Sequence, residues 1–450
     1  MKSKLTGMLK LTLLFMVTAE IVTAQSKPLD VKTAINMALA NNSSLRSDSL
    51  DISVADYKNR ELAGSYRPQV KYSSGMEYNP AIPSQMVPGS LTGQPSKELV
   101  PVQFGTKYNL KSGIEATQTI YRKDLLIQIK SAGLNTLIAK TKYNLSKEEL
   151  VYQVASTFYS LQTNAEMIRT TRHDYLNMKE VLSIAKGQYE NGLLKRIDYE
   201  SLEINVANME SQLNKLLTQY NDQLAYFNYL TGLPASAETI ISDSISNDLN
   251  SPLKGNNLAL REDIRLSRQM MESKEVELKS IRAEKLPVIS SYFRYYFQSQ
   301  FDEPGKAFNG DYLTKASTLG LSVSVPILDG SRRKSRISTA TIQLEQLKLQ
   351  SRQQEEKAEM ELFSAKGTFG NKQQQYSITK KNLELASKVF ETRKALYTEG
   401  VTTLMELLDA ESELSQARNH YMQALIDVQT GRLDLHRANG TLLTEFLKSI

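Results

Sequence analysis

Two very long segments without proline restrict the fold more than any other feature of this 450-residue chain. Residues 122–188 contain only Gly133 and Gly187 as glycines, and residues 331–396 contain only Gly367 and Gly370. As single helices, they would each extend roughly 100 Å at ~1.5 Å per residue, far beyond an ordinary globular helix. The pair of glycines in the second segment predicts a local irregularity there.

Apolar residues recur along these segments at alternating spacings of three and four. The first segment carries Val151, Val154, Phe158, Leu161, Ala165 and Ile168 at this spacing. A later stretch continues it with Leu414, Ala417, Tyr421, Ala424, Val428 and Gly431. Such spacing is typical of coiled-coil packing, and the small residues predict a close approach of helices. We therefore interpret these residues as core and not as a cofactor site.

The chain contains an internal duplication. The sequence Tyr189-Glu190-Asn191-Gly192 recurs as Tyr397-Thr398-Glu399-Gly400, 208 positions later, and Thr231-Gly232 matches Asn439-Gly440 at the same offset. This predicts a first repeat over residues 25–232, a linker over 233–255, a second repeat over 256–440 and a C-terminal tail over 441–450. The linker is rich in Ser, Asn, Asp and Pro.

Each repeat contains two runs of alternating polar and apolar residues. We predict strands at about 68–78 and 105–121 in the first repeat, and at about 287–300 and 312–327 in the second. Alternation of this kind is typical of barrel strands with apolar residues facing lipid. It is equally typical of half-buried strands in a soluble sheet, and the strands alone leave both interpretations open.

The first residues have the pattern of a secretory signal. Lys2, Lys4 and Lys10 are followed by a short apolar region, and small residues end at Ala24, which predicts a signal peptide over 1–24. An N-terminal membrane anchor is the less favoured alternative. No other segment approaches the ~18 apolar residues of a spanning helix. The mature chain is therefore expected to be soluble and exported, or to enter a membrane by another route such as a β-barrel.

The composition argues against several classes of site. The chain has no cysteine, which excludes disulfides, thiolate metal sites and a lipid-anchored N-terminal cysteine. The formal net charge of +6 is mild, and the basic residues lie among acidic ones, so no nucleic-acid partner is predicted. The three histidines lack metal-ligand spacing, and no phosphate-binding loop or nucleophile elbow occurs. We expect neither an enzyme nor a cofactor.

Four strands cannot close a barrel, and an open sheet would leave its edges exposed, so the pattern favours oligomerisation. The duplicated helix–strand–strand–helix unit and the prolines before the first strands, Pro68 and Pro287, resemble the TolC-type outer-membrane efflux protein family. The resemblance also rests on two turn motifs. They are Tyr-Glu-Asn-Gly-Leu-Leu-Lys-Arg-Ile-Asp at 189–198 and Tyr-Thr-Glu-Gly-Val-Thr-Thr-Leu-Met-Glu-Leu-Leu-Asp-Ala at 397–410.

The resemblance implies a mixed, mainly α fold. Three copies would form an α-helical periplasmic barrel and share a 12-stranded transmembrane β-barrel. The protein would lie in the outer membrane of a Gram-negative bacterium and extend into the periplasm. As a passive channel, a homotrimer within outer-membrane lipid, it would receive substrates from a periplasmic adaptor protein and an inner-membrane pump of the RND or ABC class.

Two alternative functions stay open. One is an exit duct for type I protein secretion, which belongs to the same channel class. The other is an exported structural coiled-coil protein, which would keep the heptads but has no need for duplicated amphipathic strands.

The resemblance also implies site residues at the periplasmic tip, in the turns near 189–198 and 397–406. Glu406 and Asp409 stand where the family has acidic rings that narrow the pore and favour cations. The simpler interpretation is a solvated helix face, since the two residues are three positions apart.

The family's closed gate uses polar bonds between tip helices, and this chain matches them only in part. Asp198 and Tyr397 match the family's Asp and Tyr, but Thr402 occupies the position of its Arg. Arg196 is a candidate substitute donor. Replacing both Asp198 and Tyr397 is predicted to raise single-channel conductance.

Two further sets of residues are candidates for surface contacts. The turns at Gly192, Leu193, Gly400 and Val401 would meet the adaptor, although ordinary helix termination explains the glycines equally well. The cluster Arg332, Arg333, Lys334 and Arg336 follows the last strand. It would face lipid headgroups or simply begin a solvated helix.

Overall fold

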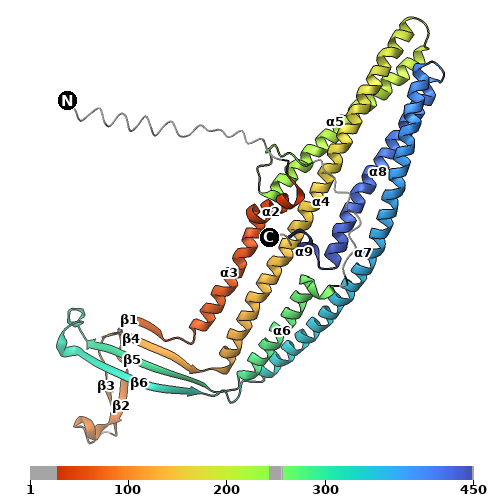
Figure 1. The fold of residues 1–450 in the computed structure, drawn as a ribbon. Helices are drawn as coiled ribbons and strands as arrows, with labels where there is room; N and C mark the ends of the chain where they lie inside the picture. Colours follow the sequence, from red (N-terminus) through yellow and green to blue (C-terminus); the bar gives the residue numbers. More distant parts are fainter. Residues whose placement is uncertain (1–27, 97, 243–254, 256, 448–450) are drawn as a thin grey trace, which may run out of the picture. The chain divides into compact units, whose positions relative to one another are not determined.

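The computed structural model describes residues 28–96, 98–242, 255 and 257–447 (Figure 1). The predicted signal peptide at 1–24 lies outside these residues, as do most of the predicted linker and the end of the predicted tail. The chain divides into two compact units. The helical unit comprises 1–47, 144–261 and 357–450, and the sheet unit comprises 48–143 and 262–356. Each unit takes residues from both sequence repeats.

Eight α-helices are found in the described part of the chain. They are α2 (Val31–Asn41), α3 (Ser43–Gly64), α4 (Lys123–Glu190), α5 (Arg196–Thr231), α6 (Glu262–Ala283), α7 (Arg332–Thr398), α8 (Leu404–Ala438) and α9 (Leu442–Leu447). Helices α4 and α7 have 68 and 67 residues, as expected from two segments without an internal proline. No helix among the described residues is long and apolar enough to cross a membrane.

The irregularity predicted at Gly367 and Gly370 is absent, because α7 continues through both residues. Each glycine costs a helix only about 1 kcal/mol relative to alanine. Packing of the neighbouring Phe369, which is buried with Leu362 and Val428, outweighs that cost.

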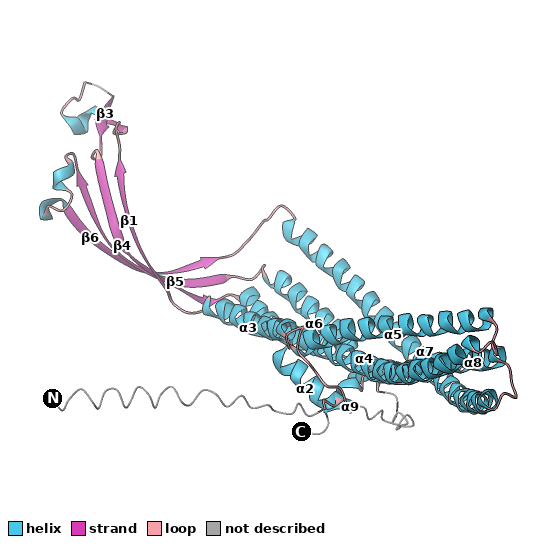
Figure 2. Cartoon of the chain, turned by 90° about the horizontal axis from the view of Figure 1, so that it is seen from above, coloured by secondary structure: helices cyan, strands magenta, loops and turns pink. Residues whose placement is uncertain are grey.

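The sheet unit contains a four-stranded antiparallel sheet in the order β1-β4-β5-β6 (Figure 2). These strands are β1 (Gln69–Tyr78), β4 (Tyr108–Tyr121), β5 (Val288–Phe301) and β6 (Leu313–Ser324). The register aligns Val70, Ala116, Phe293 and Leu319 across all four strands, so the apolar positions of each strand share one face. On the other face, Glu115 forms ion pairs of 2.7 Å with Lys71 and 2.8 Å with Arg294.

The proline-rich segment between β1 and β4 has structure of its own. It folds into a two-stranded hairpin of β2 (Ser84–Pro88) and β3 (Leu99–Gln103). Backbone hydrogen bonds between β2 and β3 therefore order part of this connection.

The core of the helical unit follows the predicted apolar seam. Val151, Val154, Phe158 and Leu161 of α4 are at most 2% exposed, and Val428 of α8 is fully buried. Gly431 shows why the seam needs small residues. A Cβ atom there would lie 2.7 Å from Cδ of Lys372, so α7 and α8 approach too closely for a larger residue.

Candidate functional site

The candidate site is the pair of turns that join α4 to α5 and α7 to α8, all within the helical unit. In the first turn, Gly192 has φ 74°, its amide donates to the Tyr189 carbonyl at 2.9 Å, and Leu193 donates to Gln188 at 2.8 Å. In the second, Gly400 has φ 73° and the equivalent bonds are 3.0 Å and 2.9 Å. Both turns are thus Schellman caps that require a left-handed residue, and both repeats end their long helix in the same way.

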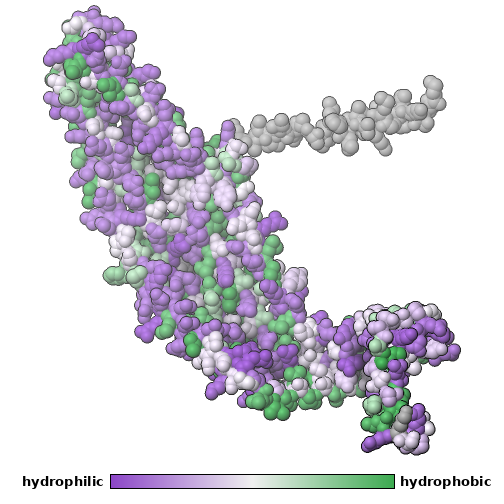
Figure 3. All heavy atoms as spheres, turned by 180° about the vertical axis from the view of Figure 1, so that it is seen from behind, coloured by the Kyte–Doolittle hydropathy of each residue, from purple (hydrophilic) through white to green (hydrophobic). Residues whose placement is uncertain are grey.

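The turns expose apolar side chains at the end of the helical unit. Leu193 and Val401, each directly after its glycine, are 81% and 70% exposed. Ile197 and Met405, each in the first turn of the next helix, are both 68% exposed. Hydrophobic surface is visible at this end of the helices in Figure 3. These exposed apolar residues make the two turns a candidate interaction surface.

A hydrophobic core beneath the turns holds the four helices together. Its buried residues come from all four helices: Met178, Val181, Ala185, Leu202, Val206, Phe390, Leu404, Leu407, Ala410 and Leu414. The hairpins α4–α5 and α7–α8 therefore pack directly on one another. Contacts between polar groups at their boundary depend on the relative position of the two hairpins.

Glu406 and Asp409 lie on the exposed face of α8, opposite its buried residues Leu404, Leu407 and Ala410. Thr403 is the N-cap of α8, because its side-chain hydroxyl accepts a hydrogen bond from the backbone amide of Glu406. The carboxylate of Glu406 is not free: Arg393 of α7 donates to it at 2.5 Å, and the Thr402 hydroxyl also bonds to it.

Arg393 is the tip residue that sequence reasoning missed. It lies four positions before Tyr397 and also contacts the Thr402 hydroxyl at 3.4 Å. This chain has Thr402 where the resemblance expects an arginine, and the guanidinium of Arg393 from the preceding helix lies next to that threonine. The predicted substitute, Arg196, donates to Glu200 of its own helix at 2.7 Å.

Asp198 and Tyr397 lie near one another across the two hairpins. The Tyr397 hydroxyl is buried and has no hydrogen-bond partner within the described structure. Burial raises the pKa of Tyr397, and the negative charge of Asp198 raises it further. A buried hydroxyl without a partner is unfavourable, so the Tyr397 hydroxyl would gain stability from donating a hydrogen bond to a nearby acceptor.

A second polar layer lies deeper between the hairpins. Arg418 of α8 pairs with Asp174 of α4, and each of these side chains is 14% exposed. Both residues line a cleft of about 370 Å³ together with Asn205 and the buried Glu411. Burial raises the pKa of Glu411, and a hydrogen bond from Asn205 partly opposes that effect.

The described residues contain no group of three or more His, Cys, Asp or Glu side chains arranged to hold a metal ion. The site is instead a set of acidic, apolar and hydrogen-bonding groups at the turns of two helical hairpins.

The comparisons with known proteins agree with one another. The model of the family described as "Outer membrane efflux protein" matches residues 34–233 and 255–441. The cation efflux system protein CusC of Escherichia coli strain K12 is 22% identical over 427 residues, which cover 91% of this chain and 86% of CusC.

Solved structures share the fold. A crystal structure of CusC superposes with a TM-score of 0.73 at 20% identity and covers 91% of each chain. The Campylobacter jejuni CmeC outer membrane channel gives a TM-score of 0.75 at 15% identity, covering 92% of this chain and 86% of CmeC.

Proposed function

The chain belongs to the outer membrane efflux protein family, and we propose that it is the outer-membrane channel component of a tripartite efflux system. The protein is an outer-membrane transport protein of a Gram-negative bacterium. In the proposed system an inner-membrane pump supplies the energy, a periplasmic adaptor links the pump to this protein, and the channel conducts passively without catalysis.

The observation that carries the proposal is the duplicated cap at the tip. Two hairpins end in the same type of glycine turn, expose apolar residues at equivalent positions and rest on one shared core. Leu193 and Val401 offer an adaptor a repeated apolar contact on turns that are held by backbone hydrogen bonds. Docking on such turns would cost less conformational entropy than docking on unstructured loops.

The sheet supports a trimer. Among the described strands, β1 and β6 each pair on one side only, so both edges present unpaired backbone groups. Pairing β6 of one copy with β1 of the next would remove these edges, and three copies would give a closed barrel of 12 strands. The apolar face would then contact lipid, and the face with Lys71, Glu115 and Arg294 would line the lumen.

The acidic residues suggest the substrate class. In a trimer, three copies of Glu406 and of Asp409 would place negative potential at the narrow end of the tunnel and favour cations. Arg393 reduces the contribution of Glu406 because it forms an ion pair with that carboxylate. The relative CusC is named a cation efflux protein, and we extend that preference to this chain. No observation favours the type I secretion duct or the structural coiled coil.

Conductance in planar bilayers tests the proposal. We expect the purified trimer to give small, steady, cation-selective currents that multivalent cations block from the tip side. Replacing Glu406 and Asp409 together by Ala should relieve the block. Correct insertion with no current in the wild type or in any tip variant would contradict the channel function, and failure to insert would favour an exported coiled-coil protein.

A further inference from the structure

The four places where a helix of the sheet unit meets a strand share one feature, which is exposed positive charge. The junctions are α3 to β1, β4 to α4, α6 to β5 and β6 to α7. Exposed cations occur at every one of them: Arg67, Lys123, Arg282, Lys285, Arg332 and Lys334. We call these six residues the basic belt.

The belt is continuous, because hydrogen bonds and an ion pair link each junction to the next. The Tyr66 hydroxyl bonds to the backbone of Arg122 at 2.8 Å and 2.9 Å, which joins the first two junctions. Ser280 donates to the Asp124 carbonyl at 3.1 Å, and Arg336 pairs with Glu284 at 2.6 Å, which joins the others. The register places all four junctions at one end of the sheet.

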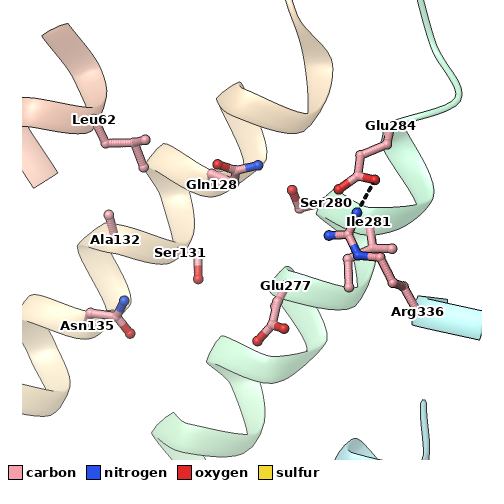
Figure 4. Close-up of a pocket in the computed structure, with 10 residues that line it drawn as sticks. All are labelled: Leu62, Gln128, Ser131, Ala132, Asn135, Glu277, Ser280, Ile281, Glu284 and Arg336. Atoms are coloured by element: carbon pink, nitrogen blue, oxygen red, sulfur yellow. Dashed lines mark hydrogen bonds and ion pairs between the residues drawn. The ribbon is translucent and has the colours of Figure 1, made fainter. Parts of the chain in front are cut away.

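The carboxylates at these junctions are already occupied. Asp124 pairs with Arg122 at 3.1 Å, and Asp329 pairs with Arg333 at 3.5 Å. The Glu284–Arg336 pair lies beside a cleft of about 340 Å³, where the two side chains point toward each other (Figure 4). The six belt residues form no ion pair within the part of the chain that the structure describes. The belt therefore presents excess positive charge.

An apolar surface ends where the belt begins. Val325, Ile327 and Leu328 precede Arg332 and are 51%, 93% and 90% exposed. Ile120, three positions before Lys123, is 52% exposed, and Val70, three positions after Arg67, is 68% exposed. A change from exposed apolar residues to cations within a few positions matches the boundary between the hydrocarbon and the headgroups of a bilayer.

The opposite end of the same sheet has a different charge pattern. Around its loops, the cations Lys107, Lys306 and Lys315 lie among the carboxylates Glu77, Asp302, Glu303 and Asp311. Of the two ends of the sheet, the helix end therefore carries the excess of positive charge, whereas the opposite end carries charges of both signs.

We propose that the basic belt binds the phosphate headgroups of anionic phospholipids in the periplasmic leaflet of the membrane. The inference rests on the proposed membrane insertion of the sheet. Lysine and arginine side chains extend toward headgroup phosphates while their aliphatic stems cover apolar surface, and each attracts anionic lipid electrostatically. The belt thereby fixes the depth of the sheet in the bilayer and selects the lipids that surround it.

Lipid association at the protein surface tests this inference. The full-length protein is reconstituted in liposomes with phosphatidylglycerol or phosphatidylethanolamine carrying the same spin-labelled acyl chain. We expect phosphatidylglycerol to associate roughly two- to fivefold more strongly. The preference should shrink in about 0.5 M salt, because exposed charges are screened.

Two triple variants separate the belt from general charge. K285Q/R332Q/K334Q neutralises three belt cations and should bring the two lipids close to parity. K107Q/K306Q/K315Q removes the same charge at the opposite end of the sheet and should leave the preference intact. An equal loss in both variants, or no preference in the wild-type protein, would overturn the inference. About 10 mM inorganic phosphate should reduce the preference no more than another salt of the same ionic strength. A larger reduction would show that the belt binds free phosphate and would also overturn the inference.

Measuring ion conductance through the protein in the same liposomes distinguishes a failure of this inference from a failure of the proposed function. A protein that inserts and conducts but shows no headgroup preference would refute the belt alone. A protein that does not insert would refute both.

Discussion

At the scale of single residues, the electrostatics of the tip depend on which ion pair each charged side chain forms. Glu406 has Arg393 at 2.5 Å across the turn, while Arg196 has Glu200 at 2.7 Å along its own helix. Both pairs are largely exposed, so each contributes little to stability. The two pairs differ in where they lie: the Arg393–Glu406 pair includes a proposed pore residue, whereas the Arg196–Glu200 pair does not.

Replacing Arg393 by Gln should expose the full charge of Glu406 and strengthen the block by multivalent cations. We expect the blocking concentration to fall by roughly three- to tenfold, because one screened ion pair is lost in each of three copies. The R196Q variant is the matched control and should leave the block unchanged. If both variants behaved alike, the pairing of Arg393 with Glu406 would not govern the acidic site.

The neighbourhood of Asp198 and Tyr397 leads to a second prediction. Asp198→Ala together with Tyr397→Phe should raise single-channel conductance, because it removes the groups poised to bond the two hairpins together. The unsatisfied Tyr397 hydroxyl also predicts that Tyr397→Phe alone destabilises the protein little, since no hydrogen bond is lost. Bilayer recordings and thermal melts of the single and double variants measure both effects. A double variant with wild-type conductance would exclude this pair from the gate.

At the scale of helices and strands, the boundary between the hairpins contains a carboxyl group that burial disfavours in its charged form. Glu411 is 8% exposed, and its raised pKa means that the folded protein holds its proton at a pH where the unfolded chain has released it. The folded state binds more protons in that range, so its stability falls as the pH rises from the ordinary glutamate pKa through the raised one.

Replacing Glu411 by Gln should therefore stabilise the helical unit at neutral pH and have little effect near pH 4. We expect the unfolding free energy at pH 7 to rise by about 1 kcal/mol. Glutamine removes the buried negative charge and can keep a hydrogen bond with Asn205. Thermal melts at both pH values measure it. The exposed Glu413, two residues further along α8, provides the control for removal of a carboxylate, and E413Q should leave the unfolding free energy at pH 7 unchanged. A destabilised E411Q protein at pH 7 would contradict this account.

The sequence was informative where structure depends on local periodicity. Heptad spacing predicted that Val154, Phe158 and Leu161 are core residues, and all three are buried. It was misleading at Gly367 and Gly370, where packing of Phe369 overrides helix propensity.

The contacts of the site were harder to predict. The pairing of Arg393 with Glu406 joins residues 13 positions apart across a turn, so it depends on how two helices are rotated against each other. The bond between Arg418 and Asp174 spans 244 positions. Sequence spacing contains no information on such contacts unless the packing of the helices is already known.

At the scale of the whole molecule, the proposed trimer accounts for apolar residues that one chain leaves uncovered. Met360 and Phe363, one turn apart on α7, are 61% and 83% exposed. Further along the helix, Leu385 and Val389 are 52% and 46% exposed. Large apolar side chains repeated along one helix are stable in water when another helix covers them, and a second copy of the chain supplies one.

Replacing Phe363 by Asp should therefore weaken the trimer, because the charge would be buried at a subunit contact without a partner. Size-exclusion chromatography with light scattering should show a shift toward monomers in detergent. Leu193→Asp is the matched control: Leu193 is 81% exposed, close to the 83% of Phe363, but it lies at the tip turn. That variant should remain trimeric and lose adaptor binding instead. If F363D stayed trimeric while L193D dissociated, both assignments would be wrong: Leu193 would lie at the subunit contact and Phe363 would not.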